Sequence, residues 1–415
     1  MFRSLARSVK HFTTAALLLL LLLLALEVGL QWSHPPAPQR IARTSAELNA
    51  LLAPSATVHH ELQRLSTQRL PDGSVFTTNS LGLRGTEILR TKPADTLRII
   101  VLGDETVLGP ALQDAHTLPA RLQQFLARVS QRPVEVINAG VPGYSPLLSL
   151  LQLKHELQTL SPDLVILHFD MSDVADDSVY RRSLKEAGEH QICPSPLLTA
   201  ESGPQNPLLR GLRDSALARL LRNRAGLQDG ADQPAPDFAE RYAWTTAVQT
   251  DLRLQIQHAV LPLEDLAQIS KQLNFPCLIG TAPVPWQVAD RSDFPDLAAE
   301  IGDTMSWPAT EDIPIRILQA VSERLAMPFC DATAAFRTFD QPQKLFQPGR
   351  TELSAYGTAL YAREIASALM TTPELAGLFT DRSRLTRRTG GAAIKPVAGT
   401  GDGRLPGYTS DLGLR

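Results

Sequence analysis

The sequence predicts an α/β domain in which helices cover both faces of a central, mostly parallel sheet, a three-layer α/β/α sandwich. Two observations lead to this prediction. Short apolar runs rich in β-branched residues end in glycine or acidic residues, as buried parallel strands do. Stretches with apolar residues at helical spacing alternate with these runs, and such an order is typical of parallel strands joined by crossover helices. With 415 residues, 43% of them hydrophobic, the chain can bury a large core.

The elements follow one another in a regular order. The first half contains the expected strands 97–103, 134–140 and 162–170, separated by the expected helices 117–130 and 147–160. The pattern resumes with helices 263–273 and 313–325, strands 275–284 and 327–333, and a last helix over 354–370. Ligand sites in such sheets lie at the carboxyl ends of strands. Here those ends are rich in polar residues, at 103–105, 138–145 and 170–173.

The N-terminal region predicts a membrane anchor. Residues 1–12 form a basic tip without acidic residues, and an apolar segment over 13–32 contains eight consecutive leucines, Leu17–Leu24. A helix over 13–30 measures roughly 27 Å, close to the hydrocarbon thickness of a bilayer. Because basic flanks stay in the cytoplasm, the domain is expected on the outer, periplasmic or extracellular, side. A cleaved signal peptide is the alternative, but no small-x-small cleavage site follows the apolar segment.

The remaining segments are interpreted from composition. Residues 33–75 are expected to be a linker and lead-in, 76–372 the folded domain, and 373–415 a disordered tail. Residues 180–255 interrupt the alternating pattern and predict an insertion that could serve as a lid.

Composition excludes several classes of function. The net charge of −3 argues against a nucleic-acid binder, which needs a basic surface. Three cysteines are too few for a disulfide scaffold, and Cys277 and Cys330 fall in expected strands, as core thiols do. No cofactor and no metal are expected. Of the nine histidines, none follows His258.

Four motifs at the strand ends resemble the SGNH (GDSL-type) hydrolase family. They are "RIIVLGDETVLG", "VINAGVPGYS", "LVILHFDMSDVADD" and "LFQPGRTELSAYGTALYAREIASAL", and together with "TTNSLGLRG", similar to a lead-in of membrane-anchored members, they cover roughly residues 76–370. The resemblance implies a flavodoxin-like α/β/α fold and an ester-hydrolase ancestry.

The family's catalytic residues are replaced. Glu105 stands at the nucleophile position, Ser172 at the oxyanion-donor asparagine, and Glu352 at the catalytic histidine, with Gly349 at the aspartate. Gly143 matches the glycine whose backbone N–H binds the oxyanion. Serine attack on an ester needs a base and a donor set, so the resemblance implies a degenerate triad without classical esterase activity.

The acidic residues allow several interpretations. Glu105 is expected to cap a helix N-terminus, and its charge would lie where an oxyanion forms. Alternatively, Glu105 and Glu352 face each other near Asp173, and the acids share a proton or bind a cation such as Ca²⁺. Asp104 and Asp170 are candidate binding residues beside them. In the third interpretation the acids only cap loops and pair with arginines, namely Arg181, Arg182 or Arg350.

Other candidates are weaker. His168 lies within an expected strand, where a satisfied buried histidine is the favoured interpretation. Ser145 follows the second expected strand as a substitute nucleophile without an identified base. Three tryptophans fall in or near expected loops, namely Trp244, Trp286 and Trp307. They could form a platform that binds a sugar, but loop tryptophans are more often packing residues.

Two functions therefore compete. The first is a membrane-anchored binding or scaffolding module for cell-envelope glycan or lipid. The second is an active hydrolase of ester bonds in acylated carbohydrate or lipid, with a rearranged carboxylate-based site. A purely structural role in an envelope assembly is a third hypothesis, resting on the anchor and the tail alone.

Overall fold

The computed structural model describes part of the chain, namely residues 2–33, 44–69, 75–188, 190–201, 215, 217–218, 238–246, 252–302, 307 and 312–380. The chain divides into two compact units, one made of 1–40 with 196–234 and the other of 41–195 with 235–415.

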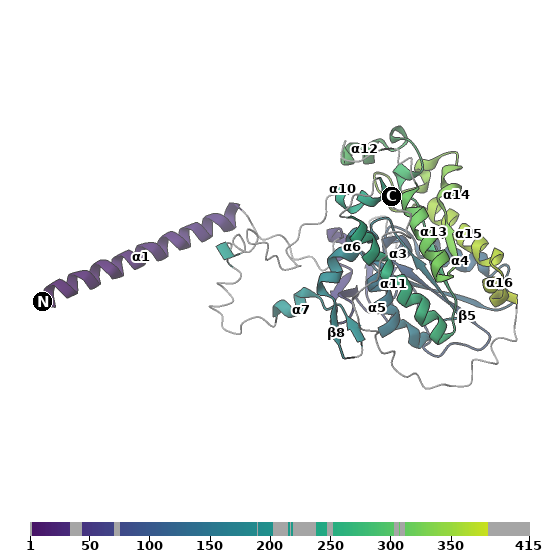
Figure 1. Cartoon of the computed structure of the whole chain (residues 1–415), viewed down its shortest axis with the longest axis horizontal. Helices are drawn as coiled ribbons and strands as arrows, with labels where there is room; N and C mark the ends of the chain where they lie inside the picture. Colours follow the sequence, from purple (N-terminus) through teal and green to yellow (C-terminus); the bar gives the residue numbers. More distant parts are fainter. Residues whose placement is uncertain are drawn as a thin grey trace. The chain divides into compact units, whose positions relative to one another are not determined.

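The first unit contains α1 (Phe2–Ser33) and α7 (Pro196–Glu201). Figure 1 shows α1 as one uninterrupted helix. Its segment His11–Leu30 has a mean hydropathy of 2.3, and it is long and apolar enough to cross a membrane. A signal sequence near an N-terminus has the same properties, so the helix establishes a candidate span and leaves its orientation a prediction.

The second unit is built on a five-stranded parallel sheet with the order β11-β10-β7-β5-β6. The strands are β5 (Leu97–Gly103), β6 (Val134–Gly140), β7 (Leu164–His168), β10 (Cys277–Thr281) and β11 (Phe329–Asp331). This confirms the predicted α/β class, and the order is that of flavodoxin-like sheets. All residues of β5, β7 and β10 are buried, which explains why their sequences are mainly apolar.

Two groups of helices flank the sheet (Figure 1). One comprises α4 (Leu118–Leu126), α15 (Ala355–Thr371) and α16 (Pro373–Thr380), and the other comprises α5 (Pro146–His155), α6 (Asp173–Tyr180) and α11 (Leu252–Leu273). α13 (Ile313–Leu325) packs against β11 and has the predicted bounds. The shorter helices are α3 (Glu105–Leu108), α12 (Pro295–Ile301), α14 (Thr333–Arg337) and the 3₁₀ turns η1 (Asp114–His116), η2 (Leu157–Leu160), η5 (Pro285–Gln287), η6 (Arg291–Asp293) and η7 (Pro342–Leu345).

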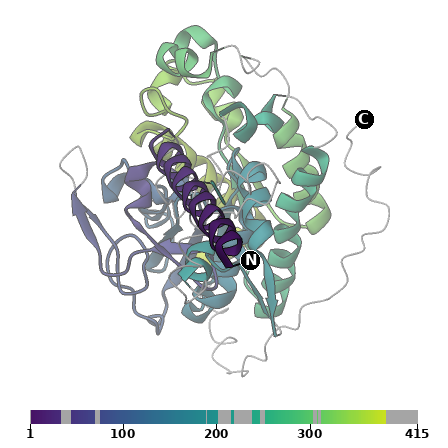
Figure 2. The same ribbon diagram turned by 90° about the vertical axis from the view of Figure 1, so that its left-hand side faces the viewer.

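The folded domain begins earlier than predicted. Residues 44–69, expected within a linker, form α2 (Ala46–Asn49), β1 (Leu52–Pro54), β2 (His60–Leu62) and β3 (Thr67–Arg69), and β3 pairs with β4 (Val75–Thr77). Figure 2 shows β3 and β4 as a hairpin at the edge of the domain. The linker prediction is wrong here because apolar side chains of this segment enter a second core cluster, among them Leu52, Val58 and Leu62. Residues 34–43 and 70–74 of the predicted linker lie outside the described residues.

The domain also ends later than predicted. Residues 373–380, assigned to a disordered tail, form α16, and its Leu375 and Phe379 are buried against the core. Residues 381–415 lie outside the described part of the chain.

The predicted insertion 180–255 is described in part. It contributes η3 (Arg181–Ser183), the antiparallel pair β8 (Lys185–Ala187) and β9 (His190–Ile192), α10 (Phe238–Arg241) and η4 (Ala243–Thr245). Trp244 of η4 is buried. Most of 202–237 and all of 247–251 lie outside the described residues, so a lid movement stays a prediction.

Candidate functional site

The segments that follow β5 and β6 lie in direct contact because Gly140, at the end of β6, has no side chain. A Cβ on Gly140, the last residue of β6, would lie 2.3 Å from the backbone nitrogen of Leu108. Only glycine therefore lets α3 pack directly on the end of β6. This close approach brings Glu105, the first residue of α3, to the loop that contains Gly143.

Glu105 occupies the donor that the resemblance assigned to an oxyanion. Its buried carboxylate accepts a hydrogen bond from the Gly143 backbone N–H at 2.9 Å through Oε2, and one from the Thr44 hydroxyl at 2.9 Å through Oε1. The Glu105 carboxyl group therefore lies at the donor that the resemblance assigns to an oxyanion. The predicted capping role is wrong, because Asp104 is the N-cap of α3 and accepts from the Thr106 N–H at 2.9 Å.

The peptide unit between Pro142 and Gly143 is held at both ends. Its N–H donates to Glu105, and its carbonyl oxygen lies 2.8 Å from His60 Nε2. Because a carbonyl only accepts, His60 carries its proton on Nε2. Its Nδ1 then accepts from His59 Nδ1 at 2.9 Å. A hydrogen bond to the carbonyl polarises the peptide and strengthens its N–H as a donor.

Both histidines are neutral under ordinary conditions. Burial lowers the pKa of His59 to about 4. Burial, together with the neighbouring His59, lowers the pKa of His60 to about 3. The sequence analysis missed this pair, since two adjacent histidines 80 residues from Gly143 have no spacing that indicates a shared site.

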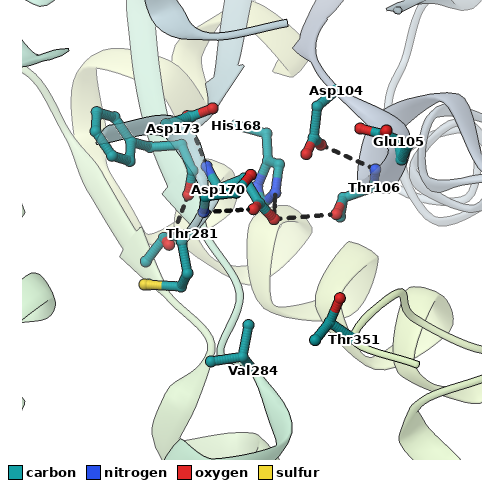
Figure 3. A network of polar contacts seen from close by, with 12 residues as sticks. Asp104, Glu105, Thr106, His168, Asp170, Asp173, Thr281, Val284 and Thr351 are labelled. Atoms are coloured by element: carbon teal, nitrogen blue, oxygen red, sulfur yellow. Dashed lines mark hydrogen bonds and ion pairs between the residues drawn. The ribbon is translucent and has the colours of Figure 1, made fainter. Parts of the chain in front are cut away.

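Three aspartates gather at the ends of β5 and β7, as Figure 3 shows. The Asp170 N–H donates to Asp173 Oδ2 at 2.8 Å, and Asp170 Oδ1 accepts from the Ser172 N–H at 2.8 Å. The Thr106 hydroxyl lies 3.4 Å from Asp170 Oδ2. Asp170 and Asp104, the two predicted binding residues, are thus brought together with Asp173.

The aspartates differ in their ionisation. Burial and then the charge of Asp170 raise the pKa of Asp104 well above its ordinary value. Burial and then the charge of Asp104 do the same to the pKa of Asp173. For Asp170 burial opposes ionisation, but its polar and charge interactions with His168, together with hydrogen bonds from Ser172, outweigh burial and lower its pKa to about 2.

Ser172, the residue at the predicted oxyanion-donor position, lies in the turn between β7 and α6. Its N–H is used by Asp170, and its hydroxyl oxygen lies 3.4 Å from Arg241 Nη2. Its backbone forms the N-cap of α6. The Ser172 N–H therefore serves the turn between β7 and α6, while its hydroxyl oxygen accepts from Arg241.

Arg241 supplies positive charge to this acidic region. Its Nη2 lies 3.0 Å from Asp176 Oδ2, and the two side chains are 24% and 1% exposed. Burial raises the pKa of Asp176 even though Arg241 opposes that shift. The sequence analysis named Arg181 as an acid's partner, and Arg181 does pair with Asp177 at 2.9 Å. It did not name Arg241.

Glu352 lies near enough to Glu105 for their charges to interact. Burial is the larger cause of the raised pKa of Glu352, and the negative charge of Glu105 adds to it. Within the described residues, however, no hydrogen bond joins the two carboxylates, and Glu105 is already bonded to Thr44 and Gly143. A directly shared proton between the two glutamates is therefore not the arrangement found.

The remaining candidates are packing residues. Trp244 and Trp286 are 1% and 0% exposed, and their ring N–H groups donate to Met171 O and Thr245 Oγ1. This confirms packing over a sugar platform for these two. Ser145 is buried, and in the described part of the chain its hydroxyl has neither a hydrogen-bond partner nor a base.

The described residues place an acidic side chain at each of two positions that the resemblance assigns to catalysis. The nucleophile position carries a carboxylate, and that carboxylate fills the one family donor that the chain retains. The last block places Glu352 at the position that the resemblance gives to the catalytic histidine, and burial together with the charge of Glu105 raises the pKa of Glu352.

The fold is similar to that of solved esterases and lipases. A lipase/acylhydrolase from Enterococcus faecalis matches with 16% identity and a TM-score of 0.34, over 66% of this chain and 94% of that one. A catalytic mutant of an acetylxylan esterase from Geobacillus stearothermophilus matches with 15% identity and a TM-score of 0.38, over 68% and 96%. No protein-family model and no curated protein matches the sequence.

Proposed function

We propose that this chain is a membrane-anchored SGNH-like protein that has lost ester hydrolysis and binds a cell-envelope glycan. The observation that carries the first half is the bond from the Gly143 N–H to Glu105. A hydrolase must keep that donor free for a developing oxyanion. Here an internal carboxylate occupies it, and the same carboxylate replaces the nucleophile.

A surface hollow supports the second half of the proposal. It has a volume of about 340 Å³ and lies beside the start of α15. Phe339 and Tyr356 line it and are 37% and 66% exposed. Exposed rings offer apolar faces, and Asp340, Gln341 and Lys344 beside them offer hydrogen-bonding groups. That combination suits a sugar, which has both apolar faces and hydroxyl groups, better than an acyl chain.

The proposal predicts binding without turnover. Purified full-length chain in detergent should not release product from a small acetyl ester above the buffer rate, with or without added divalent cations. On an array of acylated and unacylated envelope glycans it should bind, and Tyr356→Ala should weaken that binding about tenfold or more, because a stacked ring contributes roughly 1–3 kcal/mol.

Two comparisons make the test decisive. Leu89→Ala removes another exposed apolar side chain, 66% exposed, and should leave glycan binding unchanged. Sustained ester turnover that is abolished by Glu105→Gln would support the rearranged hydrolase instead. Binding to lipid vesicles but to no glycan would reject the sugar as ligand.

We propose that α1 is an uncleaved anchor with its N-terminus in the cytoplasm. The basic residues ahead of His11–Leu30 and the hydropathy of that segment support this. Mass spectrometry of the membrane fraction should detect peptides from 1–10 on the mature chain, and protease added to spheroplasts should digest the domain. Recovery of a soluble chain lacking residues before 33 would contradict the anchor.

A further inference from the structure

The carboxyl ends of β5 and β7 form the topological switch point of the sheet. The chain passes from β5 outward to β6 and then returns to β7 on the other side of β5. At such a point the loops diverge and leave a crevice where α/β proteins bind ligands. Asp104 follows β5, His168 ends β7, and Asp170 lies two residues beyond it.

These three side chains converge on one point, as Figure 3 shows. One ligand atom from each of Asp104, His168 and Asp170 lies within 4.8 Å of the others, and in the described part of the chain this is the one such group. Oxygen and nitrogen ligands about 2.0–2.2 Å from a tetrahedral zinc ion are roughly 3.4 Å apart, so the three ligand atoms must move closer together to hold an ion.

His168 is prepared as a ligand in a way that a packing histidine is not. Its Nδ1 lies 2.9 Å from the Tyr361 hydroxyl, whereas its Nε2 is buried, has no hydrogen-bond partner in the described structure, and lies 3.6 Å from Asp170 Oδ2. The sequence favoured a buried histidine whose ring nitrogens both have hydrogen-bond partners. In the described structure only Nδ1 has one. In the tautomer whose Nδ1–H donates to the Tyr361 oxygen, Nε2 keeps its lone pair for an ion, which is the outer-shell arrangement of metal-binding histidines.

Two glycines make room for this arrangement. A Cβ on Gly280 of β10 would lie 2.6 Å from the Tyr361 hydroxyl, and a Cβ on Gly103 would lie 3.0 Å from the His168 Cβ. The backbone thus keeps space for the histidine and for the tyrosine that holds it.

We propose that Asp104, His168 and Asp170 bind a divalent transition-metal ion of the zinc and manganese class. A nitrogen ligand beside two carboxylates favours these ions over Ca²⁺ and Mg²⁺, which prefer oxygen alone. Three protein ligands leave a position for water, and the Asp170 side chain, 16% exposed, marks the side open to solvent. This proposal does not depend on the proposed glycan binding.

Titration calorimetry tests the site on full-length chain in detergent, purified without a polyhistidine tag and stripped with a chelator. We expect one Zn²⁺ per chain, bound at least tenfold more tightly than Ca²⁺ or Mg²⁺. His168→Gln and Asp170→Asn should each lower Zn²⁺ affinity by more than tenfold. Tyr361→Phe should lower it about 10–100-fold, as loss of an outer-shell partner does.

Controls separate the site from general acidity. His155→Gln alters a histidine that bonds to Gln191 O instead, and it should bind Zn²⁺ like the parent chain. Melting of the stripped variants checks that each is folded, and the absorption bands of bound Co²⁺ should disappear in His168→Gln. Absence of Zn²⁺ and Mn²⁺ binding, equal binding by the parent, His168→Gln and Asp170→Asn, or tighter binding of Ca²⁺ would each overturn the proposal.

Discussion

Replacing Arg241 with methionine is expected to lower the free energy of unfolding by about 3–5 kcal/mol near pH 8. The substitution keeps much of the side-chain volume but removes the charge that lies 3.0 Å from Asp176 Oδ2. Asp176 is 1% exposed and would be left as a buried anion without its cation. Denaturant unfolding, followed by the fluorescence of the buried Trp244 and Trp286, measures the change.

Two further variants identify the cause of that loss. Asp176→Asn combined with Arg241→Met should recover most of the stability, because it removes the stranded charge. Arg363→Met breaks a pair with Glu364 in which Arg363 is 62% exposed, and it should cost less than about 1 kcal/mol. A loss below 1 kcal/mol in Arg241→Met would show that Asp176 does not depend on this cation.

Lowering the pH from 8 to 5 is expected to destabilise the domain through His60 by about 2 kcal/mol. The folded-state pKa of about 3 lies below the ordinary value of 6.5, so the folded protein binds fewer protons than the unfolded chain. The contribution of His60 to the free energy of unfolding is fully present above pH 6.5 and is lost as the pH falls toward 3. Each pH unit below 6.5 costs about 1.36 kcal/mol. Because pH 5 lies 1.5 units below 6.5, the expected loss there is about 2 kcal/mol.

The comparison with His60→Gln isolates this effect. Glutamine does not titrate, and its amide can still donate to the Pro142 carbonyl. The raised pKa values of Asp104, Asp173 and Glu352 act in the opposite direction, favouring the folded state at lower pH, and they are common to both proteins. Unfolding at pH 8 and pH 5 should therefore show a drop that is about 2 kcal/mol smaller in His60→Gln. Equal drops in the two proteins would contradict the assignment.

The alternating part of the fold could be predicted closely from sequence. The strands β5 and β6 and the helix α13 have the predicted bounds because each has an uninterrupted periodic pattern with clear ends. α11 extends eleven residues before the predicted start at Leu263, and Pro262 lies inside it. Proline usually ends a helix, which is why the pattern was interpreted as beginning after it.

The edges of the domain could not be predicted because their structure depends on distant partners. The strand residues Leu52 and Leu62 pair with each other and pack into a cluster that includes Tyr144 and Tyr180. Short strands of three residues have no periodicity to detect.

The sequence predicted where the candidate site lies, but it did not predict which residues form hydrogen bonds there. The strand-end rule brought Glu105, Gly143 and Asp170 to one edge of the sheet, and the structure places them there. The partners that determine their chemistry come from elsewhere in the chain, namely Thr44, His60 and Tyr361. Nothing in their local sequences indicates these contacts, since each depends on how the loops and helices fold over the strand ends.

The hydrogen bond from Thr44 to Glu105 sets a practical limit for anyone who wishes to study the domain without α1. Thr44 is eleven positions beyond Ser33, and a fragment trimmed to the predicted boundary at residue 76 would lack it together with β1, β2 and β3. Such a fragment would leave one oxygen of a buried carboxylate without its donor and would expose the apolar cluster beneath. A soluble version of this protein should therefore start before Thr44.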